Sequence, residues 1–177
     1  MELNEIWLKR IVTLALEEDV GLGDVTTLST VPVGYRGKAR MWLKEDAIVA
    51  GMDVGKAVFA HLDSSLQFIP SVKDGEFLTA GTEIARVEGK MRSILTGERT
   101  ALNFMQRLSG IATQTGKMVK LLEGTRARVI DTRKTTPGLR MLEKYAVSVG
   151  GGANHRWALD SGVLIKDNHL RADGGVE

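Results

Sequence analysis

Residues 131–169 concentrate side chains that can carry positive charge: Arg133, Lys134, His155, Arg156 and Lys166. Arginine forms bidentate hydrogen bonds with carboxylate or phosphate groups, and lysine supplies a mobile point charge. Bringing such groups together is unfavourable unless anions bind among them, because like charges disfavour each other's charged forms. The cluster therefore favours a binding site for a small polyanion. The alternative is that Asp131, Asp160 and Asp167 neutralise it in ordinary surface ion pairs.

A β-α-β unit is expected to position this cluster. The segments 127–131 (ARVID) and 162–167 (GVLIKD) have the apolar pattern of buried parallel strands. Thr136 followed by Pro137 predicts the N-cap and first residue of an intervening helix, which Gly150 ends. Ligands bind at the carboxyl ends of parallel strands, so the cations would meet there, beside the free N–H groups at the helix start.

The preceding residues predict an α+β arrangement of helices and short strands. Asp24, in the expected loop 21–27, is predicted to satisfy backbone groups of a turn rather than to hold a ligand. Pro70 makes its strand an edge strand. The pattern predicts helices over 4–18, 52–62, 91–108 and 111–122, and extended segments over 35–50, 67–72 and 83–87.

Composition and motifs exclude several classes of function. The 177 residues carry a net charge of +2 and 5% aromatic residues, which argues against nucleic-acid binding by bulk charge or by stacking. Without cysteine, disulfides and thiolate metal sites are impossible, and the three histidines lack zinc-ligand spacing. Neither a P-loop nor a dinucleotide fingerprint is present. The sequence shows no signal peptide or membrane-spanning run, so we expect a cytoplasmic protein with no membrane contact.

Four segments closely resemble the quinolinate phosphoribosyltransferases, also called nicotinate-nucleotide pyrophosphorylases (carboxylating). They follow the family's order and extend over essentially the whole chain: EDVGLGDVTT (18–27), GERTALNFMQRLSGIAT (97–113), DTRKTTPGLRMLEKYAVSVGGGANHR (131–156) and LIKDNH (164–169). The third segment is long enough to be highly specific to the family.

The resemblance implies an α/β protein with two parts. Residues 1–110 would form an α+β sandwich domain that includes an interface helix, and residues 111–177 would form the start of an α/β barrel, which is incomplete in this chain. It also implies a homodimer, with a hexamer left open. The implied enzyme is a pentosyltransferase of de novo NAD biosynthesis. Quinolinate and phosphoribosyl pyrophosphate, with Mg²⁺, would give nicotinate mononucleotide, CO₂ and pyrophosphate.

By the same resemblance, the quinolinate pocket would be formed by Arg99, Thr132, Arg133, Lys134, His155, Arg156 and Lys166. Lys134 and Lys166 are carried over as catalytic. From helical spacing alone Arg99 belongs to a solvated face, but the resemblance places it in the pocket of a partner subunit. These residues include no metal ligand.

A complete (β/α)₈ barrel needs roughly 250 residues, and only about 50 follow Ala127. The residues that bind Mg²⁺, ribose and phosphate are expected beyond the polar turn 173–177 (DGGVE). We therefore expect the 177 residues alone to be inactive. Two alternatives stay open: a related protein associated with molybdenum transport, and a non-catalytic module that binds anions or another subunit.

Overall fold

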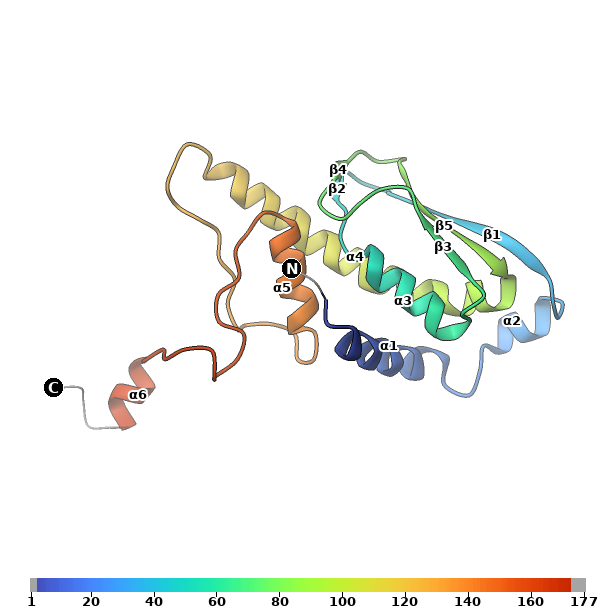
Figure 1. Ribbon diagram of the computed structural model, residues 1–177, viewed down its shortest axis with the longest axis horizontal. Coiled ribbons are helices and arrows are strands. Elements are labelled where there is room, and N and C mark those ends of the chain that lie inside the picture. Colours follow the sequence, from blue (N-terminus) through green and yellow to red (C-terminus); the bar gives the residue numbers. More distant parts are fainter. Residues whose placement is uncertain (1–2, 173–177) are drawn as a thin grey trace.

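The computed structural model describes residues 3–172 (Figure 1). The turn expected at 173–177 lies outside these residues. The fold mixes helices and strands, as expected, and the named strands pair in antiparallel fashion. Its elements, in chain order, are α1 (Glu5–Val20), α2 (Val25–Thr30), β1 (Arg36–Trp42), β2 (Ala47–Ile48), α3 (Met52–Leu62), β3 (Gln67–Pro70), β4 (Phe77–Leu78), β5 (Glu83–Lys90), α4 (Met91–Leu121), α5 (Arg140–Val149) and α6 (Asp167–Ala172).

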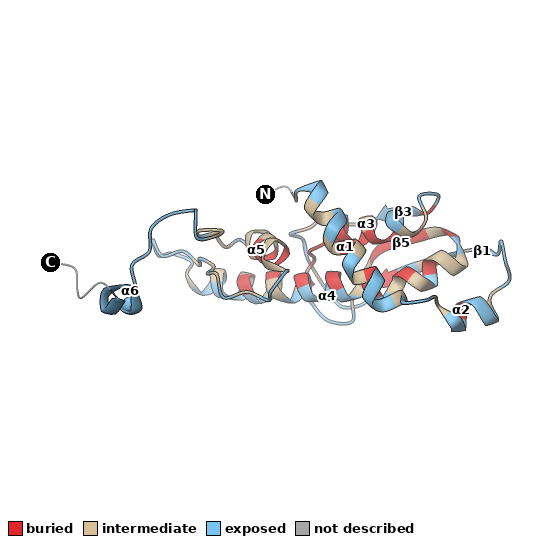
Figure 2. Cartoon of the chain, turned by 90° about the horizontal axis from the view of Figure 1, so that it is seen from below, coloured by how far each residue is buried: buried red, intermediate tan, exposed pale blue. Residues whose placement is uncertain are grey.

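The N-terminal part is a sheet packed on helices. A three-stranded antiparallel sheet has the order β1-β5-β3, and β2 pairs with β4 in a second, two-stranded sheet. β3, which contains Pro70, is an edge strand as predicted. One face of β5 is buried through Ala85 and Val87, against a core that includes Phe59 of α3 and Ile94 of α4. Figure 2 shows the buried residues concentrated where α3, α4 and β5 meet.

Local capping accounts for the first two helices. Asn4 caps α1: its side chain accepts a hydrogen bond from the Trp7 N–H at 3.0 Å. The expected loop 21–27 is partly wrong, because α2 begins at Val25. Asp24 caps this helix by accepting from the Thr27 N–H at 2.9 Å, so its predicted structural role holds.

α4 is one helix, which corrects the predicted break between residues 108 and 111. Glycine inside a helix costs about 1 kcal/mol relative to alanine. Leu108 and Ala112, on either side of Gly110, are almost completely buried against the core. Their packing outweighs the local cost, so the helix continues through the glycine. The predicted domain boundary at 110/111 thus lies within α4.

α5 begins three residues later than predicted. Gly138 has φ +81°, a left-handed conformation that an α-helix does not contain, and the helix starts at Arg140 after a turn closed by Leu139. The free N–H groups of a helix starting at Pro137 are therefore not available to the site. The N–H of Thr136 instead donates to the side chain of Glu143 at 3.1 Å.

The two predicted strands of the C-terminal part do not form as strands. Of the segment 127–131, only Ile130 forms a bridge, which is parallel and pairs with Ala153. The segment 162–167 has no strand partner among residues 3–172, and α6 begins at Asp167. Apolar side chains such as Val163 and Ile165 are exposed there. A strand needs a neighbour for its N–H and C=O groups, and none is available within the described segment.

Tyr145 fastens α5 to the N-terminal part. Its hydroxyl donates to Asp74 at 2.5 Å, and the same carboxylate accepts from the backbone N–H groups of Gly51 and Met52 at 2.7 and 3.1 Å. Burial, together with the bond to Asp74, raises the pKa of Tyr145 well above its usual 10. Leu142 of the same helix joins the core.

None of the described helices is sufficiently long and apolar to cross a membrane.

Candidate functional site

A pocket of about 420 Å³ lies among residues 130–166 of the C-terminal part. It gathers six of the seven predicted site residues from three separate segments: Thr132, Arg133, Lys134, His155, Arg156 and Lys166. Ile130, Asp131 and Leu164 complete its lining. The lining does not include the seventh residue, Arg99, whose exposed side chain lies on α4.

The parallel bridge brings the first two segments together. The N–H of Ala153 donates to the carbonyl of Val129 at 2.9 Å, and the N–H of Asp131 donates to the carbonyl of Ala153 at 3.1 Å. Residues 132–134 and 155–156 directly follow these paired positions. The bridge therefore places both sets of cations at one edge.

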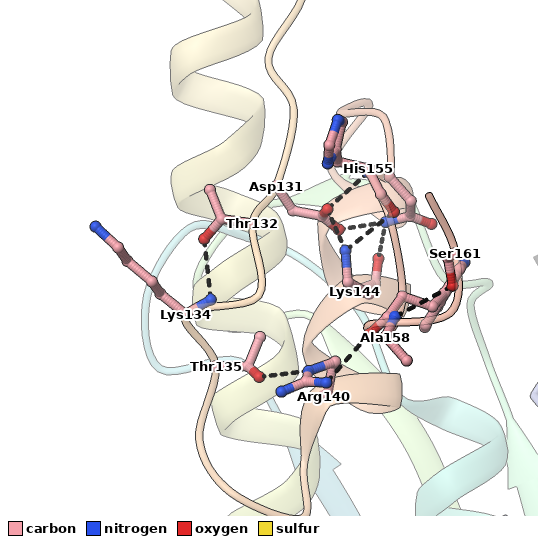
Figure 3. Close-up of polar contacts among 11 residues, drawn as sticks. Asp131, Thr132, Lys134, Thr135, Arg140, Lys144, His155, Ala158 and Ser161 are labelled. Carbon is pink, nitrogen blue, oxygen red and sulfur yellow. Dashed lines mark hydrogen bonds and ion pairs between the residues drawn. The ribbon is translucent and has the colours of Figure 1, made fainter. Parts of the chain in front are cut away.

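A buried ion pair lies directly behind the pocket (Figure 3). The Lys144 ammonium, which is 0% exposed, donates to the Asp131 carboxylate, which is 7% exposed. Asn154 Nδ2 and the His155 N–H also donate to this carboxylate, at 2.6 and 2.8 Å. The ammonium lies 5.2 Å from the centre of the Trp157 ring. None of these bonds to Asp131 comes from a cationic side chain of the predicted cluster.

A second charged contact holds the other end of the loop 132–135. Glu143 of α5 accepts from the Arg107 guanidinium and, at 3.1 Å, from the Thr136 N–H. Burial raises the pKa of Glu143, but the hydrogen bonds from Arg107 and Thr136 outweigh this effect and hold the pKa below its usual 4.5. Arg140 of α5 adds a bond to the Thr135 hydroxyl at 3.1 Å.

The sequence interpretation missed Glu143 and Lys144. A signal was present for Glu143, since its position falls between Leu139, Leu142 and Ala146 on the apolar side of α5. A charge at such a position needs a partner from another element. Arg107 of α4 is that partner.

The pocket cations lack carboxylate partners within the described part of the chain. Across residues 3–172, no salt bridge involves Arg133, Lys134, Arg156 or Lys166. The buried Nε of Arg133 has no hydrogen-bond partner there. Arg156 donates to the carbonyl of Gly162 at 3.2 Å. This arrangement disfavours the alternative of neutralisation by Asp131, Asp160 and Asp167, and can hold a ligand with several negative charges.

The fold and the site define a protein with a cationic pocket for a small polyanion, and comparison with known proteins identifies its family. Residues 24–109 match the N-terminal domain of quinolinate phosphoribosyl transferase, and residues 111–177 match its C-terminal domain. The chain belongs to the quinolinate phosphoribosyltransferase family.

Individual relatives agree. The chain is 48% identical over 170 residues to quinolinate phosphoribosyltransferase [decarboxylating] 1 of Nicotiana glauca, covering 96% of this chain and 48% of the relative. It is 45% identical over 175 residues to the probable nicotinate-nucleotide pyrophosphorylase [carboxylating] of Bacillus subtilis, covering 98% and 60%. The crystal structure of NadC from Streptococcus pyogenes superposes with a TM-score of 0.93 at 42% identity, covering 99% of this chain and 62% of that one. The chain thus spans about half the length of the plant relative.

Proposed function

We propose that the whole protein transfers the phosphoribosyl group of phosphoribosyl pyrophosphate to quinolinate, with loss of CO₂. The relatives' names support this reaction. The observation that carries it is the pocket, in which Arg133, Lys134, Arg156 and Lys166 lack carboxylate partners among the described residues. Quinolinate presents two carboxylates beside a ring nitrogen, and several cations are needed to bind and orient such a dianion.

The proposed reaction uses these residues mainly to position charge. The ring nitrogen forms a bond to C1′ of the ribose while the bond from C1′ to the pyrophosphate oxygen breaks, and pyrophosphate leaves with the electron pair. The bond between the ring and the adjacent carboxylate then breaks. CO₂ departs, and the electron pair left on the carbon is stabilised by the neighbouring positive nitrogen until a proton from solvent replaces the carboxylate. Lys134 and Lys166 would stabilise the charge that changes during these steps.

Arg133 is proposed as the principal carboxylate ligand. Its Nε is buried at the pocket without a hydrogen-bond partner in the described structure, and a buried donor in that state is costly unless a ligand accepts from it. A guanidinium can bind a carboxylate through two parallel hydrogen bonds. Lys134 and Lys166, both exposed, can approach the second carboxylate as mobile charges.

The pocket is proposed to be completed by groups outside this set. Arg99 is exposed on α4 and does not line the pocket of its own chain, which supports its delivery by a second copy in a homodimer. Mg²⁺ does not fit the residues described: they contain no group of three or more His, Asp or Glu able to hold a metal. We therefore expect it to bind with the pyrophosphate.

The C-terminal part is proposed to be the beginning of an α/β barrel. The exposed apolar residues of the segment 162–165 suit a strand buried between two neighbours, and the Ile130 bridge has the parallel direction such a barrel requires. The 67 residues matched by the C-terminal family model are too few to close a barrel of roughly 250 residues.

The test is CO₂ release from quinolinate by the whole protein, with and without phosphoribosyl pyrophosphate. Release should need both substrates, and Arg133→Ala should lower kcat/KM for quinolinate at least about a hundredfold, since it removes a bidentate charged contact. Arg126→Ala is the matched control, because Arg126 is exposed and does not line the pocket. Equal activity of Arg133→Ala and the control would contradict the proposal.

A further inference from the structure

We propose that Glu143 and Lys144 are positioning residues that hold the loop 132–135 in its substrate-binding shape from its two ends. This inference rests on the proposed function. The two residues are consecutive in α5, and their side chains reach opposite ends of the loop: Lys144 contacts Asp131, immediately before it, and Glu143 contacts Thr136, immediately after it.

The first end is fixed through Asp131. Its carboxylate accepts from Lys144, from Asn154 Nδ2 and from the N–H of His155, so one buried group joins α5 to both cation-bearing segments. Asn154 Nδ2 also donates to the carbonyl of Lys144 at 2.9 Å. Figure 3 shows the contacts of Lys144 and His155 meeting at Asp131, beside the loop. A shift of Lys144 would therefore move residues 132 and 155 together.

The second end is fixed through Glu143. The exposed fraction of this residue is 9%, and its carboxylate joins the Thr136 N–H to the Arg107 guanidinium of α4. Arg107 also donates to the Thr136 hydroxyl. Arg133 and Lys134 thus lie on a short span anchored to two helices. Within this span the Lys134 N–H donates to the Thr132 hydroxyl, and Arg140 of α5 donates to the Thr135 hydroxyl, both at 3.1 Å.

Loss of the Glu143 anchor should weaken the binding of quinolinate. If the anchor at Thr136 is lost, Arg133 and Lys134 sample other positions, and a dicarboxylate must reorder them on binding. The binding of phosphoribosyl pyrophosphate should change less, because the residues that bind its ribose and phosphate groups are expected outside this loop. A general loss of folded protein would instead lower kcat and leave both KM values unchanged.

The experiment compares three variants of the whole protein. Glu143→Ala should raise the KM for quinolinate about tenfold or more, the size of effect seen when groups that orient a ligand are removed. Glu143→Gln keeps an oxygen that accepts from Thr136 and should restore most of this loss, with KM within about threefold of the unmodified protein. Tyr145→Phe is the control: it removes a hydrogen bond made two positions further along α5, but that bond joins Asp74 and not the loop.

Hydrogen exchange provides a readout that does not depend on the reaction. The amides of residues 132–136 should exchange faster in Glu143→Ala than in Tyr145→Phe, because the Thr136 N–H has lost its acceptor. If Glu143→Ala does not fold, Arg107→Ala decides, since Arg107 is exposed enough to be removed; it should raise the quinolinate KM at least about threefold.

An unchanged quinolinate KM, or an equal rise in Tyr145→Phe, would overturn the inference. Absence of CO₂ release from the unmodified whole protein would instead refute the proposed function, while the exchange data would still decide whether Glu143 anchors the loop.

Discussion

Replacing Lys144 with methionine tests the buried ion pair behind the pocket. Lys144 is fully buried and the Asp131 side chain is 7% exposed, so methionine would leave a buried carboxylate without its cation. Removing one partner of a buried pair costs about 3–5 kcal/mol. Asp131 would keep the bonds from Asn154 and His155, at 2.6 and 2.8 Å, so we expect the lower end of this range, about 3 kcal/mol.

The assay is equilibrium unfolding in urea. With a slope of about 2 kcal/mol per molar, a loss of about 3 kcal/mol lowers the midpoint by about 1.5 M. Asp131→Asn combined with Lys144→Met should recover part of this loss, because a neutral amide is cheaper to bury than an unpaired carboxylate. Lys38→Met is the control; its 2.8 Å pair with Glu88 is exposed and should be worth less than about 1 kcal/mol.

Two outcomes would contradict a stabilising role for the ion pair between Lys144 and Asp131. A midpoint for Lys144→Met that matches the Lys38→Met control would show that the buried pair contributes little. A double variant at least as unstable as Lys144→Met would show that the cost comes from lost packing of the lysine stem and not from the unpaired charge of Asp131.

Three further predictions concern α5 and its surroundings. The pKa of Glu143 is lower in the folded than in the unfolded protein, so its ionised carboxylate stabilises the fold fully above the unfolded pKa near 4.5. This stabilisation is lost as the pH falls through the folded pKa. Between about pH 5 and pH 3 the urea midpoint should therefore fall less steeply in Glu143→Gln than in the unmodified protein. Tyr145→Phe should cost about 1 kcal/mol in the same assay by removing the bond to Asp74, and a midpoint unchanged from the unmodified protein would contradict this. Gly150→Ala should cost about 1–3 kcal/mol, because the new methyl group would overlap the carbonyl oxygen of Ala112; full stability would show that α4 and α5 can separate.

The sequence predicted elements well where local signals and burial agree. Asn4, Pro70 and the apolar spacing of α3 each determine a local feature, and the structure contains all three. Gly110 was misjudged because the cost of one glycine is local, whereas the burial of Leu108 and Ala112 that outweighs it depends on distant elements.

The candidate site, too, was predicted only in part. Charge type and the family resemblance indicated Arg133, Lys134 and Lys166, which line one pocket in the structure. The groups that hold them were not predicted, since Arg107 and Glu143 lie on different helices and are 36 positions apart in the sequence. The strand expected at 162–167 also depends on neighbours, and the described residues supply none.

The amounts of CO₂ and pyrophosphate that the whole protein releases are the most direct test of the proposed transfer of a phosphoribosyl group to quinolinate. With quinolinate labelled in the carboxylate next to the ring nitrogen, and with phosphoribosyl pyrophosphate and Mg²⁺ present, labelled CO₂ and pyrophosphate should appear in equal amounts. Neither should appear when phosphoribosyl pyrophosphate is omitted. Pyrophosphate release at the same rate with nicotinate in place of quinolinate, or no labelled CO₂ under any of these conditions, would contradict the account.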